Sequence, residues 1–108
     1  MSYFRRRRMI ENYNLMGPVK AALESSARYL AAELGPKGIR VHAISPGPLK
    51  TRAAHFDALL DQAAERAPAR RLVTIEDVGF AVAGLATDAA KLITGDTIYI
   101  DGGYHIMG

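Results

Sequence analysis

The chain has 108 residues, of which 49% are hydrophobic and 23% charged, and it contains neither cysteine nor tryptophan. This is the profile of one ordinary soluble domain, and two domains do not fit in the length. Without cysteine, a disulfide framework, a thiolate zinc site and a cysteine nucleophile are excluded, and a cytoplasmic location is expected. No apolar stretch approaches the roughly 20 residues of a membrane helix, so no membrane partner is expected.

The net charge of +3 is a local feature of the sequence. The run Arg5 to Arg8 supplies four positive charges, and the rest of the chain carries one net negative charge. No aromatic platform or binding motif accompanies the run, so we expect no nucleic-acid partner. Residues 1–12 are interpreted as a poorly specified basic segment that leads into a helix.

A helix is predicted from the capping candidates Asn12 and Asn14 to Leu34. Apolar residues recur every three or four positions and predict one stripe facing the core: Val19, Leu23, Ala27, Leu30 and Leu34. The charged residues between them predict an opposite, solvated face: Lys20, Glu24 and Arg28. Pro18 predicts a bend or a late helix start, and Gly35-Pro36 ends the helix.

Two strands and two further helices are predicted after this helix. Ile39 to Ile44 is rich in β-branched residues, and the two prolines of Ser45-Pro46-Gly47-Pro48 are expected to end that strand. Residues 51–66 have a helical pattern that Ala67-Pro68 closes. Thr74 to Asp77 has the form of a capping box, and the helix after it presents one apolar face: Val78, Ala81, Val82 and Leu85. Residues 97–100 form the second predicted strand, followed by an Asp101-Gly102-Gly103 loop.

The order of these elements predicts an α/β fold with a parallel sheet, because helical crossovers join parallel strands. Only two strands are visible, whereas parallel sheets normally contain more strands and are covered on both faces. Residues 1–108 are therefore interpreted as a single partial domain.

Tyr13, Met16 and Lys20 are spaced to project from nearly the same side of the first helix. A phenol and an ammonium so placed can form a proton-transfer pair, because the ammonium favours negative charge that develops at the phenol or at a substrate oxygen bonded to it. The spacing alone favours the simpler interpretation, in which the tyrosine lies at the helix edge and the lysine is solvated. His42, His55 and His105 have no metal-ligand spacing, so no zinc site is expected.

The segment Tyr13 to Lys20 resembles the Tyr-x6-Lys helix of bacterial enoyl-acyl-carrier-protein reductases, which are divergent short-chain dehydrogenases. In this branch the two residues are seven positions apart, and a second tyrosine lies ten residues upstream, which here is Tyr3. The similarity continues in order through four further segments: residues 35–41, 44–51, 73–79 and 101–104.

This resemblance implies the carboxy-terminal half of a doubly wound, Rossmann-type parallel-sheet fold. The implied reaction is hydride transfer from NADH to the β-carbon of a trans-2-enoyl thioester carried by acyl carrier protein, in fatty acid biosynthesis. Tyr13 would hydrogen-bond the thioester oxygen, Lys20 would hold the nicotinamide ribose, and Tyr3 would line the acyl site. The cofactor would be closed in by the residues that follow the first strand: Leu49, Lys50, Thr51, Arg52 and Ala53. A homo-oligomer is also implied.

The sequence departs from the family pattern in ways that keep other functions open. No G-x-G-x-x-G phosphate loop lies between a strand and a helix, and the stretch between Thr51 and Phe56 looks a few residues shorter than in relatives. One alternative is a non-catalytic fragment that acts in self-association or partner binding. A 3-oxoacyl reductase is disfavoured, because the position four residues before Lys20 is Met16 and not a tyrosine.

Overall fold

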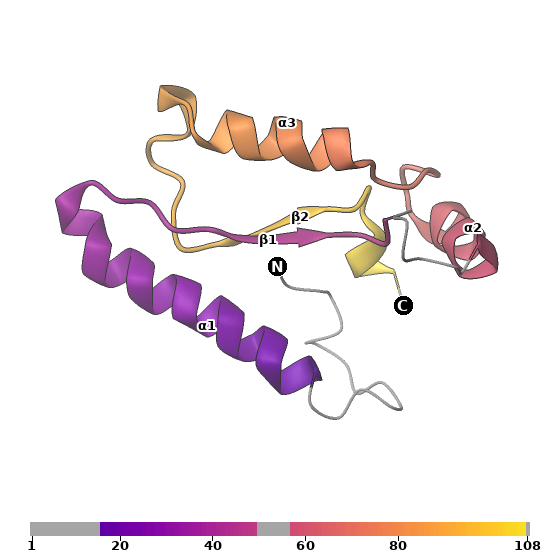
Figure 1. Ribbon diagram of the computed structural model, residues 1–108, viewed down its shortest axis with the longest axis horizontal. Coiled ribbons are helices and arrows are strands. Elements are labelled where there is room, and N and C mark those ends of the chain that lie inside the picture. Colours follow the sequence, from indigo (N-terminus) through magenta and orange to yellow (C-terminus); the bar gives the residue numbers. More distant parts are fainter. Residues whose placement is uncertain (1–15, 50–56, 108) are drawn as a thin grey trace.

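A computed structural model of the protein describes residues 16–49 and 57–107. Along the chain, the helices and strands follow one another in the order α1, β1, α2, α3 and β2 (Figure 1). Their bounds are α1 Met16–Leu34, β1 Ala43–Pro46, α2 Asp57–Arg66, α3 Ile75–Leu85 and β2 Thr97–Ile100. Single 3-10 turns occupy Gly35–Lys37, Asp88–Ala90 and Tyr104–Ile106.

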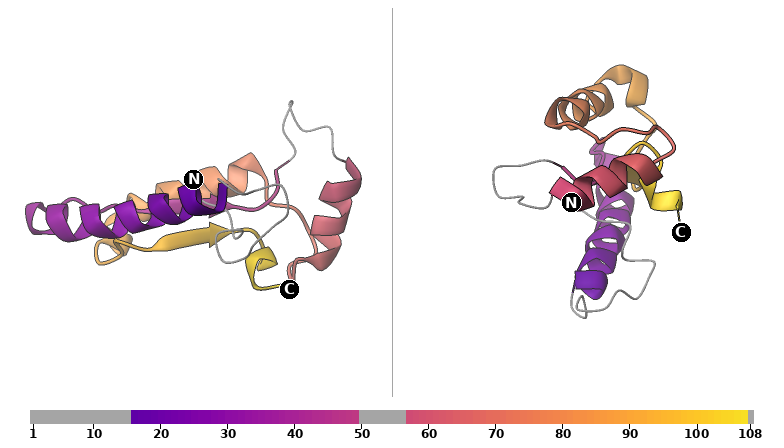
Figure 2. Two further views of the ribbon diagram at one scale, coloured as in Figure 1. Left: turned by 90° about the horizontal axis from the view of Figure 1, so that it is seen from below. Right: turned by 90° about the vertical axis from the view of Figure 1, so that its right-hand side faces the viewer.

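The two strands of the described residues form a parallel sheet, with Ala43 opposite Thr97 and Pro46 opposite Ile100. The predicted parallel α/β arrangement is therefore confirmed. In Figure 1 the sheet is seen along its edge, with α3 on one side and α1 on the other. Figure 2 shows the same layers from below and from the end, where α2 lies beyond the carboxyl ends of the strands.

The predicted bounds of the first strand were wrong, because β1 includes Pro46 and begins only at Ala43. The amide of Ala43 donates to the carbonyl of Asp96, and the amide of Gly47 donates to the carbonyl of Ile100, both at a distance of 3.1 Å. The backbone N–H and C=O groups of the odd-numbered residues therefore point toward β2. The nitrogen of Pro46 consequently faces away from β2, and its missing hydrogen costs the ladder nothing. Val41 lies before the strand and makes its hydrogen bonds to a turn instead: its amide donates to the Thr94 hydroxyl, and its carbonyl accepts from the Gly95 amide.

The predicted buried face of α1 was also partly wrong. Glu24, assigned to the solvated face, is only 3% exposed, whereas Val19 and Leu30 of the apolar stripe are 56% and 45% exposed. The helix approaches the sheet through small side chains, since Ala27 and Ala31 are buried and a Cβ on Gly95 would lie 3.3 Å from that of Ala31. The bulkier apolar residues consequently lie outside the described core.

The predicted helix ends are confirmed at three places. The first helix stops at Leu34, and Gly38 takes a left-handed conformation with φ of 78° after the following turn. The last residue of α2 is Arg66, directly before Ala67-Pro68. At the start of α3, Thr74 and Asp77 form the reciprocal capping box. Among the described residues, no helix combines the length and apolar character needed to cross a lipid bilayer.

Candidate functional site

The two strands end side by side, and the chain crosses itself closely at their carboxyl ends. Gly47 is buried, and a Cβ built on it would lie 2.8 Å from the Cβ and 3.2 Å from the Cα of Asp101. Only glycine allows the two backbones to come this close. This crossing fixes the place from which the segment after β1 leaves the sheet.

The loop after β2 is organised by the buried carboxylate of Asp101. It accepts hydrogen bonds from the amides of Gly103 and His105, at 2.9 and 3.0 Å, and it lies 3.0 Å from Nδ1 of His105. The His105 ring also stacks on Tyr99, with ring centroids 3.8 Å apart. Asp101 therefore holds the loop and the imidazole in one arrangement.

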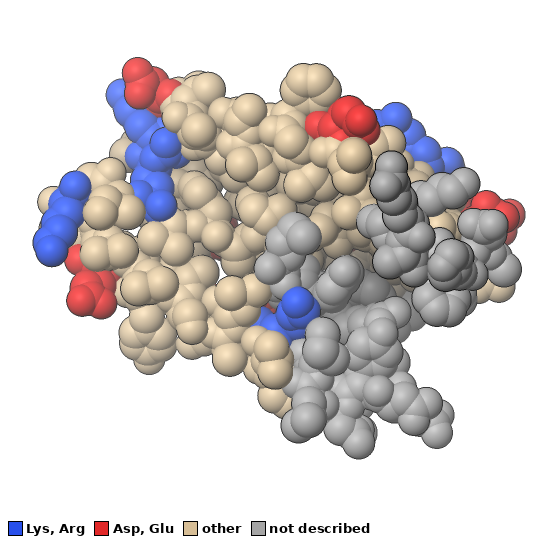
Figure 3. All heavy atoms as spheres, viewed as in Figure 1, with Lys and Arg blue, Asp and Glu red and all other residues tan. Residues whose placement is uncertain are grey.

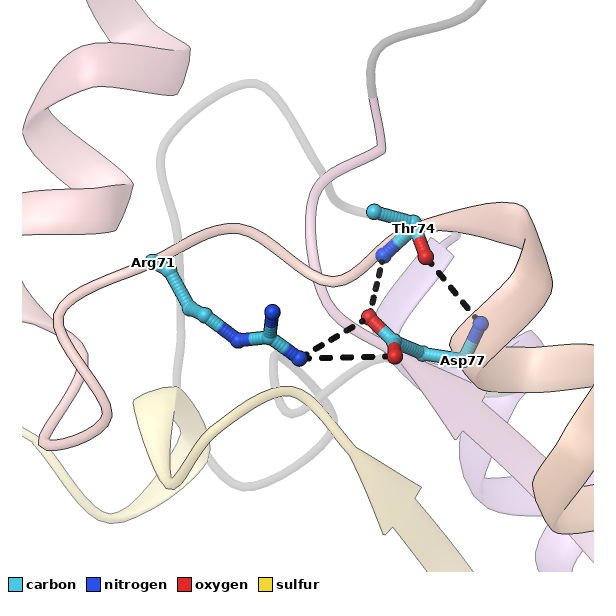
Figure 4. A network of polar contacts seen from close by, with 3 residues as sticks. All are labelled: Arg71, Thr74 and Asp77. Carbon is cyan, nitrogen blue, oxygen red and sulfur yellow. Dashed lines mark hydrogen bonds and ion pairs between the residues drawn. The ribbon is translucent and has the colours of Figure 1, made fainter.

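A cavity of about 310 Å³ opens beside this loop, between Ile100 to Gly102 and the segment from Ala69 to Val73. Arg71 and Asp77 lie at its wall, 3.4 Å apart, in the network of Figure 4. The pKa of Asp77 is lowered, mainly because its carboxylate accepts a hydrogen bond from the backbone N–H of Thr74. The Thr74 hydroxyl and the positive charge of Arg71 lower this pKa further. Because the side chain of Arg71 is 70% exposed, its ion pair with Asp77 contributes little to the stability of the fold.

Of the residues predicted from sequence to form the site, the structure describes Lys20 and Leu49. Lys20 is half-buried in the second turn of α1, and Leu49 is half-buried three residues beyond the end of β1. Helix α1 runs antiparallel to β1, so its first turns lie toward the end of the sheet at which the strands end (Figure 1). The other predicted site residues lie outside the described residues: Tyr3, Tyr13, Lys50, Thr51, Arg52 and Ala53.

The sequence prediction gave His105 no role beyond excluding it as a zinc ligand. Its position four residues after Asp101 was the available signal, because a carboxylate and an imidazole at that spacing can meet in a helical turn. Within residues 16–49 and 57–107 no three His, Asp or Glu side chains gather as a metal site.

Residues 1–105 match the sequence profile of the family described as Enoyl-(Acyl carrier protein) reductase. The chain belongs to this family. It is 46% identical to the enoyl-[acyl-carrier-protein] reductase [NADH] of Bacillus cereus over 112 positions, and 46% identical to that of Escherichia coli over 110. These alignments cover 100% and 98% of this chain, but only 44% and 42% of the relatives.

Solved structures of the family have the same fold. The crystal structure of the Bacillus cereus reductase with NADP+ and indole naphthyridinone matches 99% of this chain with a TM-score of 0.89 and 46% identity, over 43% of its own length. The Aquifex aeolicus reductase (NADH) matches with a TM-score of 0.86 and 45% identity, again over 43% of its length. The predicted Rossmann-type fold class is thereby confirmed, and the chain spans less than half the length of these relatives, in their carboxy-terminal portion.

Proposed function

We propose that this chain carries the acyl-binding and nicotinamide-binding portion of an NADH-dependent enoyl-acyl-carrier-protein reductase of fatty acid biosynthesis. The observation that supports it most is the seven-residue spacing of Tyr13 and Lys20 within a chain that matches the family over residues 1–105. The relatives' names add NADH and an acyl-carrier-protein substrate. Action in the cytoplasm and assembly as a homo-oligomer belong to the same proposal.

The described residues suit the nicotinamide end of a dinucleotide. Open α/β sheets bind ligands beyond the carboxyl ends of their strands, and the chain emerges there from the buried Gly47 to the half-buried Leu49. Lys20 is half-buried and lies near the start of α1, whose first turns lie toward the same end of the sheet. In our proposal Lys20 binds the ribose hydroxyls, and Leu49 to Ala53 close over the nicotinamide and pyrophosphate, with the Thr51 hydroxyl as one contact.

The bound dinucleotide would supply the hydride that adds to the β-carbon of the enoyl thioester. As that bond forms, the π electrons move toward the thioester oxygen and produce an enolate, which is then protonated at the α-carbon. Tyr13 would donate its O–H to that oxygen, and a donor placed where charge develops lowers the barrier. The Lys20 ammonium adds positive potential nearby, and Tyr3 lines the acyl site.

A chimera tests this proposal in a complete fold. In it, this chain replaces the aligned 112 positions of the Bacillus cereus reductase, and NADH consumption is followed with a trans-2-enoyl thioester. We expect turnover, and we expect Tyr13→Phe to lower kcat by about 10²- to 10³-fold, as loss of one such donor does. Lys20→Met should mainly raise the KM for NADH.

Lys37→Met is the matched control, because Lys37 lies exposed in the turn after α1 and should leave both constants unchanged. A folded chimera without turnover, or one in which Tyr13→Phe has no effect, would contradict the proposal.

A second candidate function is non-catalytic association. The exposure of Val19, Leu23 and Leu30 on α1 favours it, because these side chains form an apolar stripe with no described partner layer. A folded chimera that binds neither NADH nor substrate, together with a chain that self-associates in solution, would favour this second function.

A further inference from the structure

One short loop after β2 holds both ends of the segment that runs from the end of β1 through α2. At the first end, the Gly47 amide donates to the carbonyl of Ile100 at 3.1 Å, and a Cβ on Gly47 would lie 2.8 Å from the Cβ of Asp101. At the second end, the Ala69 amide donates to the carbonyl of Gly102 at 3.0 Å. Movement of this loop would therefore displace the exit of β1 and the chain after α2 together.

The loop also packs closely against the chain after α2. A Cβ on Gly102 would lie 2.8 Å from the Cβ of Ala69. A Cβ on Gly103 would lie 2.8 Å from Cγ of Pro68. Both glycines have positive φ angles, of 63° and 90°, which glycine adopts most readily. The loop and the chain after α2 consequently form one packed unit.

A buried side-chain pair sets the shape of the loop. The Asp101 carboxylate is 5% exposed, and both of its oxygens lie 3.0 Å from Nδ1 of His105. A carboxylate only accepts hydrogen bonds, so Nδ1 carries the hydrogen. The same two oxygens accept the amides of Gly103 and His105, and the imidazole stacks on Tyr99. The stacked imidazole therefore orients the carboxylate, and the carboxylate orients the loop.

Charges at the surface do not provide another support for this segment. Arg71, two residues after Ala69, pairs with Asp77 at 3.4 Å, but its side chain is 70% exposed and such pairs contribute little. On the face shown in Figure 3, the charged side chains of the described residues stand in small separate groups and form no continuous patch. The buried pair is the polar interaction best placed to hold the loop.

We propose that Asp101 and His105 are positioning residues for cofactor binding, because they hold Leu49 at the end of the sheet and the chain after α2 beside it. Leu49 follows Gly47 by two residues, and the residue between them is Pro48, whose φ is fixed by its ring. The part that Leu49 plays beside the nicotinamide rests on the proposed function. In this role the pair does not act on the reacting atoms, so the affinity for NADH should depend on it while kcat should not.

Two substitutions of His105 separate its hydrogen bond from its stacking. His105→Phe keeps a ring that can stack on Tyr99 but removes the N–H that Asp101 accepts. His105→Asn lacks the ring but places an amide N–H as many bonds from Cα as Nδ1 is. Asp101→Asn, which removes one acceptor oxygen from the loop, is the second variant if His105→Phe fails to fold.

Hydrogen exchange on the 108-residue chain tests the positioning without any cofactor. In His105→Phe, exchange of the Gly47 and Ala69 amides should accelerate at least fivefold. The Ala43 amide, which donates to Asp96 at the other end of β1, should be unchanged. His105→Asn should restore both accelerated rates to within twofold of the wild-type rates.

The chimera tests the consequence for NADH. His105→Phe should raise both the Kd for NADH, measured by fluorescence titration, and the KM for NADH about fivefold or more, and change kcat less than twofold, because a displaced binding segment orients the cofactor less well. Ala31→Gly is the control for a general loss of stability. Ala31 is buried on α1 next to Gly95, before the start of β2, and its replacement weakens the helix without touching the loop.

The outcomes distinguish this proposal from the proposed function. Unchanged exchange at Gly47 and Ala69, equal acceleration at Ala43, or no rescue by His105→Asn would overturn the positioning role. So would an Ala31→Gly chimera whose Kd for NADH rises as much as that of His105→Phe, or a His105→Phe chimera that loses kcat with its Kd unchanged. A folded wild-type chimera that binds no NADH would contradict the proposed function instead, and the exchange rates would then decide on the positioning role by themselves.

Discussion

At the scale of single residues, Gly47 and Asp101 determine how the ends of the two strands meet. The carboxylate of Asp101 is buried and accepts two amides as well as contacting the His105 imidazole, and its backbone packs against Gly47. The sequence showed glycine at position 47 only as part of a strand terminator. It could not show that a second segment, more than fifty residues later, lies within contact of that glycine.

Replacing Gly47 by alanine should destabilise the chain by about 1–3 kcal/mol, the usual cost of overpacking. The new Cβ would meet the Cβ of Asp101 at 2.8 Å, and the nearby backbone cannot move aside as a flexible side chain can. Gly84→Ala is the control, since no atom lies within 4 Å of its added Cβ and alanine favours a helix. Urea unfolding followed by far-UV circular dichroism measures both, and an unchanged midpoint for Gly47→Ala would show that the crossing is looser than described.

At the scale of elements, prediction was most accurate where the determining interactions are local. The capping box of α3 and the glycine turn after α1 depend on residues three or four positions apart, so they could be predicted from sequence. The buried face of α1 depends on which residues allow close approach to the sheet, which is a tertiary property. Ala27 and Ala31 provide that approach, and the larger residues of the predicted stripe do not.

The same distinction applies to β1 and to the site. The direction of the backbone groups decides whether Pro46 can belong to the strand, and composition alone does not report that direction. For the site, the resemblance to the family identified Lys20 and Leu49 as candidates. The contact between Asp101 and His105 depends on the burial of both side chains, which could not be predicted from the sequence.

Capping of α3 should make the stability of the chain depend on pH in the acidic range. The hydrogen bond from the Thr74 amide favours the ionised form of Asp77, so its pKa is lower in the folded state than its ordinary value of 3.8. A lowered folded pKa means that the stabilisation is present above about pH 4 and is lost as the pH falls through the folded pKa.

We therefore expect Asp77→Asn to lower the urea midpoint at pH 7 and to have progressively less effect below pH 4. Glu76→Gln is the matched control in the first turn, because Glu76 is exposed and takes no part in the capping box. A difference between wild type and Asp77→Asn that stays constant from pH 7 to pH 2 would show that the carboxylate charge does not contribute.

At the scale of the whole molecule, the core is thin for a protein of this length. The buried hydrophobic side chains among the described residues are six alanines with only Leu60 and Val73 as larger members. Large apolar side chains remain exposed on α1 and α3, on the two layers that flank the sheet.

These features predict that the isolated chain has no measurable reductase turnover, although it carries Tyr13 and Lys20. A glycine-rich loop at a helix N-terminus is the usual seat of a dinucleotide pyrophosphate, and the 108 residues contain no such motif. Without that pyrophosphate-binding site, the chain can bind NADH only through its nicotinamide end, and the binding energy needed to orient the hydride is missing. The measurement is NADH consumption by the purified chain with a trans-2-enoyl thioester, alongside the chimera and the chain with Tyr13→Phe. Turnover by the isolated chain that disappears with Tyr13→Phe would contradict this expectation and would place a sufficient cofactor site within these residues.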